Sequence, residues 1–296
     1  GLTSVTIPDS VTTIGRQAFG FCESLTSITI PDSVTSIGES AFWSCDGFIS
    51  VTIPDSVTSI GDGAFNRCES LTSINVDSNN KYYSSEDSVL FNKDKSILIQ
   101  YPEGNTAKEY IIPDSVTAIG NSAFYFCDNL TSITIPDGVT TIGEDAFYSC
   151  DGLTSITLPD GVTTIGEDAF HACYYLTSIS LPDSLTSIGD SAFSYCGDLI
   201  SVTIPFGVTS IGYQTFYNCD SLTSITIMNP ECEIYDSPST ISNGTDYDTY
   251  EDTFNGTIYG YFDSNYYSTA YYYASRYNYK FVSLGEIPST TTSTTT

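Results

Sequence analysis

The stretch at residues 25–47, LTSITIPDSVTSIGESAFWSCDG, decides the fold of this chain, because the chain repeats it almost from end to end. The following block, residues 48–70 (FISVTIPDSVTSIGDGAFNRCES), places apolar residues at the same positions. The cysteines set the period at 23 residues, recurring as Cys22, Cys45 and Cys68 and again as Cys127, Cys150, Cys173, Cys196 and Cys219. Self-similarity at a fixed period of this length predicts a solenoid, in which a unit buries its apolar face only when a neighbour stacks on it.

Each unit divides into two halves. In the first half, Ile28 and Ile30 alternate with hydroxyl-bearing residues, which is typical of a strand with one buried face. Residues 31–33 (Pro-Asp-Ser) favour a turn, and residues 34–37 form a second extended piece. After Gly38, apolar residues three to four positions apart predict a single helical turn that faces inward. We therefore expect the interior of one coil to hold Leu25, Ile28, Ile30, Val34, Ile37, Ala41, Phe42 and Cys45.

The units begin at positions 2, 25, 48, 71, 130, 153, 176 and 199, and a half-unit begins at 222. The fourth unit is interrupted by 36 additional residues. Within this insertion, apolar residues 89–91 and 97–99 flank a polar loop and predict a β-hairpin. We expect a solenoid over residues 1–227 with the inserted hairpin at 77–109.

The repeat pattern ends after Ile227. We expect a strand at 257–261, a short helix at 268–277 and a strand at 279–283. A solenoid needs a terminal unit that shields its last apolar edge, so residues 228–285 are predicted to form a C-terminal cap. Residues 286–296 are a Thr-rich linker. The repeat pattern begins directly after residue 1, so we expect the chain to be a piece of a longer protein.

The chain is strongly acidic, with 8 Lys and Arg against 36 Asp and Glu and a net charge of −28. This charge argues against nucleic acid and against anionic membrane surfaces as partners, because both need clustered cations. No stretch approaches the roughly 20 apolar residues of a membrane span. The ladder spacing holds neighbouring cysteines parallel, which does not suit a disulfide, so we expect buried free thiols and neither a metal nor another cofactor.

The pattern L-x-x-I-x-I-P-D-S-V-T-x-I-G-x-x-A-F-x-x-C resembles the BspA-like, or Treponema pallidum-type, leucine-rich repeats of bacterial surface proteins, and the resemblance covers residues 2–227. It implies an α/β repeat solenoid: a right-handed leucine-rich-repeat coil dominated by parallel β-strands, with short helical turns, a hairpin insertion and a small cap. It also implies export and a role in adhesion or presentation, and it carries no catalytic residues across. The Thr-rich tail is similar to linkers that join such repeats to cell-wall or scaffold-docking modules in gut anaerobes.

Two places in the sequence are candidates for binding. The first is the slot after Ala-Phe, which carries a row of rings that either anchors a partner or covers the neighbouring turns: Trp43, Tyr125, Tyr148, His171 and Tyr217. The second is the insertion, a cationic patch that either recruits an acidic partner or only packs on the solenoid: Tyr82, Tyr83, Lys93 and Lys95.

Two further features bear on metal binding and catalysis. Columns of Asp and Glu after the proline and after Ile-Gly either hold calcium or form a solvated face with turn caps; the second interpretation is favoured because calcium needs six to eight oxygen ligands. His171 is the only histidine, and a hydrolase would need a base held by a second polar group.

We therefore expect an extracellular or cell-surface protein-interaction or adhesion module without catalysis. The alternative is a carbohydrate-binding module of a multi-modular polysaccharide-degrading or scaffold-docked protein. The partner would be a protein or a glycan on a host, a substrate or a neighbouring cell. We expect a monomer without direct membrane insertion, with the exposed N-terminal coil as the surface for any association.

Overall fold

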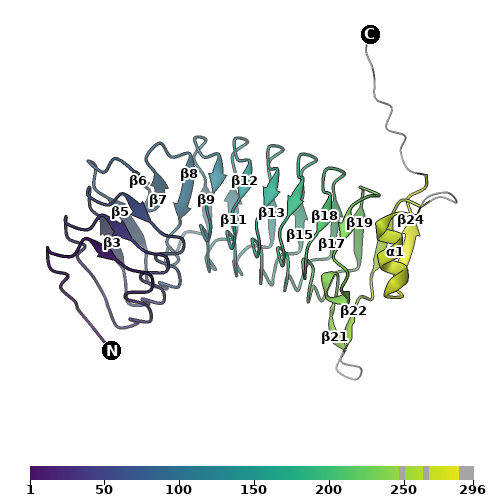
Figure 1. Ribbon diagram of the computed structural model, residues 1–296, viewed down its shortest axis with the longest axis horizontal. Helices are drawn as coiled ribbons and strands as arrows, with labels where there is room; N and C mark the ends of the chain where they lie inside the picture. Colours follow the sequence, from purple (N-terminus) through teal and green to yellow (C-terminus); the bar gives the residue numbers. More distant parts are fainter. Residues whose placement is uncertain (247–250, 263–266, 287–296) are drawn as a thin grey trace, which may run out of the picture.

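The computed structural model describes residues 1–246, 251–262 and 267–286, and it forms an elongated stack of coils (Figure 1). We number the coils from the N-terminus: coil 2 is 25–47, coil 3 is 48–70, coil 4 is 71–107 and coil 5 is 108–129. Coils 6 to 9 follow at intervals of 23 residues from position 130. Two parallel strand ladders run along the stack, as the predicted solenoid requires.

The ladder of the second extended piece consists of two-residue strands, each ending in a buried Ile or a half-buried equivalent. Neighbouring coils pair in register, with Ile14 opposite Ile37 and Ile142 opposite Ile165. Its strands are β1 (Thr13–Ile14), β2 (Ser36–Ile37), β4 (Ser59–Ile60), β10 (Ala118–Ile119), β12 (Thr141–Ile142), β14 (Thr164–Ile165), β16 (Ser187–Ile188), β18 (Ser210–Ile211) and β20 (Glu233–Ile234).

The first extended piece gives longer strands that pair in parallel in four separate groups. In residues 50–53 and 201–204, exposed hydroxyl side chains alternate with buried aliphatic ones. The longer strands are β3 (Ser50–Ile53), β5 (Ser73–Val76), β9 (Glu109–Ile111), β11 (Ser132–Thr134), β13 (Ser155–Thr157), β15 (Ser178–Ser180), β17 (Ser201–Ile204), β19 (Ser224–Ile227), β23 (Thr257–Gly260) and β24 (Lys280–Ser283).

A column of stacked phenylalanines forms the centre of the core. Phe147 is fully buried between Phe124 and Phe170, with ring centroids 5.1 Å away on each side and the planes within 7° of parallel. All nine cysteines are free, and most thiols of the column donate to a phenylalanine carbonyl, as Cys173 Sγ does to Phe147 O at 3.1 Å. Burial raises the pKa of the Cys173 thiol to about 12, so the thiol is an unreactive apolar neighbour. The predicted interior and the free thiols are confirmed.

The insertion is part of the solenoid wall. Strands β6 (Tyr83–Glu86) and β7 (Val89–Asn92) form an antiparallel hairpin. Strand β7 also pairs antiparallel with β8 (Ile97–Gln100), and β8 pairs in parallel with β10 of the next coil. Phe91 is fully buried in the core. The predicted hairpin is confirmed, and the inserted residues build an atypical coil of the wall, after which β9 begins the next coil.

The C-terminal segment continues both ladders through β20, β23 and β24 and then covers the end of the stack. Helix α1 (Thr269–Arg276) is capped by Ser268 and buries Ala270, Tyr273 and Ala274. The remaining elements are a 3-10 helix, η1 (Pro238–Thr240), and the antiparallel pair β21 (Gly244–Asp246) and β22 (Glu251–Thr253). The expected strand, helix and strand are present, whereas the Thr-rich linker from residue 287 onward lies outside the described residues.

Candidate binding surface

The segment after Gly38 forms a column of tight turns, and the helical turn expected there is absent. Ala41 N–H donates to Gly38 O and Cys45 N–H donates to Phe42 O, both at 3.2 Å. Ser40 and Ser44 adopt the left-handed region, each with φ of 53°. A residue with positive φ at the third position of a four-residue turn interrupts helical propagation, so successive turns replace the helix.

These turns are joined from coil to coil by a regular hydrogen-bond ladder, which we call the turn ladder. In coil 2, the N–H groups of residues 40, 42 and 44 donate to the carbonyls of residues 62, 64 and 66 in coil 3, at 2.8–3.1 Å. Coils 1, 5, 6, 7 and 8 donate three bonds each in the same way. This ladder fixes the outward-facing side chains of neighbouring coils at a constant spacing.

Half-buried rings on the turn ladder form a continuous row, which we call the aromatic strip. Tyr125 stacks on Tyr148 at 4.9 Å between ring centroids and 19°, and Tyr148 stacks on His171 at 4.7 Å and 5°. His171 contacts Tyr195 at 5.3 Å, and Tyr195 meets Tyr217 edge to face at 5.5 Å and 90°. The strip comprises Trp43, Tyr125, Phe126, Tyr148, His171, Tyr195 and Tyr217.

The structure therefore brings together all five rings that the sequence placed in the slot after Ala-Phe. It adds Phe126 and Tyr195, which sit one position later in their units. These two residues have φ of 56° and 60°, and this left-handed backbone turns their side chains toward the same row. Aromatic residues at the second position after Phe were the signal that sequence analysis missed.

His171 belongs to the strip as a stacked ring. Its Nδ1 lies 2.8 Å from Asp168 Oδ1, in a close contact without hydrogen-bond geometry. Beside this pair, Asp145 is mostly buried, and burial, followed by the charges of Asp168 and Glu144, raises its pKa to about 7. Several carboxylates therefore lie close together beside the strip, and Asp145 shares its surroundings with the charges of Asp168 and Glu144.

The four candidate residues of the insertion are not part of the strip, and the side chains of three of them have hydrogen-bond or ion-pair partners. Tyr83 Oη accepts a hydrogen bond from Ile60 N–H at 2.9 Å, which ties the hairpin to β4. Lys95 Nζ pairs with Glu86 Oε2 at 2.8 Å, and Lys93 Nζ donates to Asn80 O. Tyr82 is 52% exposed.

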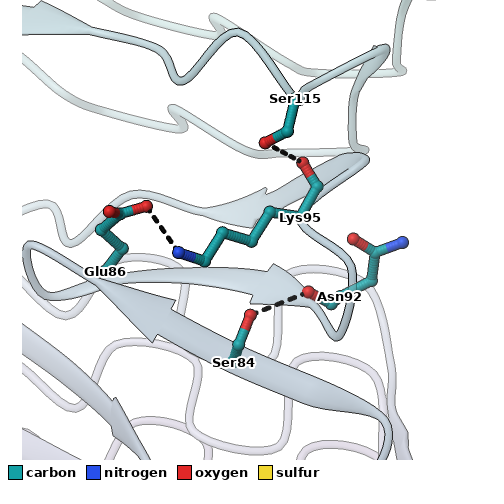
Figure 2. Close-up of polar contacts among 5 residues, drawn as sticks. All are labelled: Ser84, Glu86, Asn92, Lys95 and Ser115. Carbon is teal, nitrogen blue, oxygen red and sulfur yellow. Dashed lines mark hydrogen bonds and ion pairs between the residues drawn. The ribbon is translucent and has the colours of Figure 1, made fainter.

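Figure 2 shows how the loop around Lys95 is held: Ser84 Oγ donates to Asn92 O across the hairpin, and Ser115 Oγ from coil 5 donates to Lys95 O. Of the two interpretations of the insertion, packing accounts for the contacts of Tyr83, Lys93 and Lys95, and recruitment of an acidic partner stays a prediction. Lys95 is half-buried, whereas Lys93 is exposed.

Neither acidic column builds a metal site within the described ranges. No group of three or more His, Cys, Asp or Glu residues in this part of the chain could hold one ion. Among the helices of the described residues, none has the length and hydrophobicity needed to cross a bilayer.

The chain belongs to the BspA type leucine-rich repeat family, whose model, with six copies, matches residues 1–110 and 96–223. A leucine-rich cell-surface protein of Faecalibacterium prausnitzii is 34% identical over 86% of this chain and 64% of that chain, with a TM-score of 0.69. The pneumococcal vaccine antigen PcpA shares the fold at 24% identity, covering 95% of this chain and 68% of that one, with a TM-score of 0.78.

A leucine-rich repeat protein of Eubacterium ventriosum is 27% identical over 81% of this chain and 72% of that one, with a TM-score of 0.54. No curated protein matches the chain. The chain thus spans about two thirds of the length of the first two similar structures. It is similar to bacterial cell-surface proteins of the leucine-rich repeat class.

Proposed function

We propose that this chain is an extracellular or cell-surface interaction module that binds a protein partner through the aromatic strip and performs no catalysis. The observation that carries the proposal is the strip itself. Large amphipathic rings supply much contact area at low cost in side-chain entropy, and rings of this kind dominate the energetics of protein interfaces. Because the turn ladder holds them rigidly, little ordering remains to be done on binding.

A protein partner fits the strip better than a glycan does. In the middle of the strip Tyr125, Tyr148 and His171 cover one another's ring faces, at interplanar angles of 19° and 5°. The rings therefore present edges and polar tips to solvent, whereas a sugar packs its C–H face on an open ring face. The net charge of −28 would steer a basic partner surface toward the chain.

Similarity to cell-surface proteins supports the proposed location, and the chemistry of the strip supports the absence of catalysis. The histidine is held in a stack against Tyr148. Burial raises the pKa of the Cys173 thiol to about 12 and that of the Cys150 thiol well above its usual value, which disfavours the thiolate that a nucleophile needs.

The test is a binding screen of the whole chain against extracellular-matrix proteins and a glycan array. We expect a saturable protein interaction that weakens about tenfold or more, at least 1.4 kcal/mol, in a Tyr148→Ser, Tyr195→Ser double variant. Tyr82→Ser is the matched control, since it removes an exposed tyrosine from the hairpin and should leave affinity unchanged. Glycan binding alone, or protein binding that survives loss of the strip, would contradict the proposal.

A further inference from the structure

The turn ladder is broken at one place. In coil 3 the N–H groups of Gly63, Phe65 and Arg67 occupy the positions that donate to the next coil elsewhere, yet they donate no hydrogen bond to any described residue. Coil 4 causes the break, because after β8 it continues as a short segment in which Tyr101 replaces the phenylalanine and stacks on Phe124 at 5.4 Å. Coil 4 therefore lacks the outer turn that would meet coil 3.

A cavity of about 360 Å³ occupies the place of the missing turn. Residues of coils 2, 3, 5 and 6 line it, and coil 4 contributes none. Trp43 of coil 2 reaches across to Tyr125 of coil 5, with ring centroids 5.5 Å apart. Asn121 Nδ2 of coil 5 donates to Asp62 Oδ2 of coil 3 at 3.0 Å, so the two sides also meet at a second point.

The cavity wall is negatively charged. Of its four carboxylates, Glu39 is neutralised by Arg16 at 2.9 Å, whereas Asp62, Glu144 and Asp145 form no ion pair with any residue that the structure describes. The side chain of Arg67 lies elsewhere: it lines a separate cavity beside Trp43, and its guanidinium sits 4.3 Å from the centroid of the Phe126 ring. The negative charge of this cavity thus lacks an internal cation to balance it.

Three kinds of group converge here, and together they define a ligand. Carboxylates attract a cation, the Trp43 and Tyr125 rings favour a cationic head or its alkyl stem, and the unpaired Gly63 N–H offers a donor for a peptide carbonyl. A basic residue within a polypeptide carries the positive charge, the alkyl stem and the carbonyl group that complement these three features. A sugar carries no positive charge to pair with the carboxylates, and a simple metal ion would make no contact with the Trp43 and Tyr125 rings.

We propose that this cavity is the binding site for a lysine or arginine side chain presented by the protein partner. The inference rests on the proposed function and deepens it, because it places a specific anchor at the end of the aromatic strip that contains Trp43 and Tyr125. The cavity is small enough to select one side chain, and the strip supplies the contact area around it.

Trp43 makes the test direct, since it is the only tryptophan of the chain and lines the cavity. The fluorescence of the whole chain is titrated with Nα-acetyl-lysine methylamide and Nα-acetyl-arginine methylamide. We expect a saturable change with a Kd on the order of 1 mM for at least one of them. Nα-acetyl-norleucine methylamide, which keeps the peptide groups and loses the charge, should give no saturation.

Paired variants separate the site from general charge effects. Glu144→Gln with Asp145→Asn removes two wall carboxylates and should weaken binding of the basic probes about tenfold, as followed by Trp43 fluorescence. Asp160→Asn with Asp183→Asn removes two exposed carboxylates that follow the prolines, outside the cavity, and should leave the affinity unchanged. Circular dichroism of each variant confirms that the chain is folded before its affinity is compared.

The outcomes are decisive. No saturation with either basic probe, equal binding of norleucine amide, or equal loss in both variants would overturn the proposal. If n-butylamine binds with equal affinity, the cavity recognises an ammonium group alone, and the proposal that a polypeptide presents this group is overturned. The small probes report on the cavity whether or not the screen finds a partner protein, so failure here and failure of the proposed function are distinguishable.

Discussion

Coils 5 to 8 and coils 3 and 4 of the same solenoid have opposite character. In the first region every turn position donates to the next coil, the phenylalanines stack at 5.1–5.5 Å and each coil repeats its neighbour. In the second region the turn donors of coil 3 have no partner among the described residues, a cavity opens and, in Figure 1, the coils before the hairpin are tilted relative to the coils after β8. Regular repetition supplies stability, while the interruption supplies chemically distinct groups that a regular rung does not offer.

The largest expected effect lies in the regular region. Phe147→Ala should lower the free energy of unfolding by about 3–5 kcal/mol, because the cavity left between two stacked rings cannot collapse. Phe19→Ala should cost clearly less, since Phe19 is only partly buried and stacks on one ring, that of Phe42. Urea denaturation compares the two. Equal losses would mean that the N-terminal edge is as well covered as the centre.

A smaller effect of opposite sign is expected in coil 4. The hydroxyl of Tyr101 is buried without a hydrogen-bond partner, so Tyr101→Phe should stabilise the chain by about 1–2 kcal/mol. Tyr83→Phe is the matched control and should destabilise by about 1 kcal/mol, because its hydroxyl accepts from Ile60 N–H. Urea denaturation again measures both. A stability loss in Tyr101→Phe would show that its hydroxyl is satisfied.

A pH dependence also originates in coil 4. Burial, followed by the charges of Glu69 and Asp128, raises the pKa of Glu103 to about 8, against about 4.3 in an unfolded chain. Between these values the native state holds a proton that the unfolded state has lost, so this group makes stability fall as pH rises through that window.

Glu103→Gln should therefore flatten the dependence of melting temperature on pH between about 5 and 8 and raise the melting temperature at the alkaline end. Glu69→Gln at a neighbouring position is the control and should retain most of the slope. An unchanged slope in Glu103→Gln would place the titrating group elsewhere.

The regular coils could be predicted from sequence because each buried position is encoded in every unit. Alternation at Ile28 and Ile30 located the first ladder, and the Ala-Phe-x-x-Cys spacing located the phenylalanine column. The same spacing wrongly suggested a helical turn, since the left-handed conformation falls on Ser40 and Ser44, which are not distinctive in sequence. Backbone conformation there is imposed by pairing with the neighbouring coils.

The interrupted region was beyond sequence analysis for a physical reason. Tyr101 fills the phenylalanine column without the Ala-Phe-x-x-Cys pattern, so coil 4 was not recognised as a coil. The aromatic slot residues Trp43 and Tyr125 were both identified, but their contact depends on a segment that is missing between them. Because the cavity arises where a turn is absent, no motif in the sequence marks it.

Amide hydrogen exchange tests the central claim, the broken turn ladder, most directly. The N–H groups of Gly63 and Arg67 in coil 3 are compared by NMR with those of Asp145 and Ser149, which hold the equivalent positions in coil 6 and donate at 2.9 and 2.8 Å. The structure predicts that the coil 3 amides exchange at least about 100-fold faster, as expected for groups without an acceptor. Equal protection at both places would contradict the account, because it would mean that the ladder runs unbroken through coil 4.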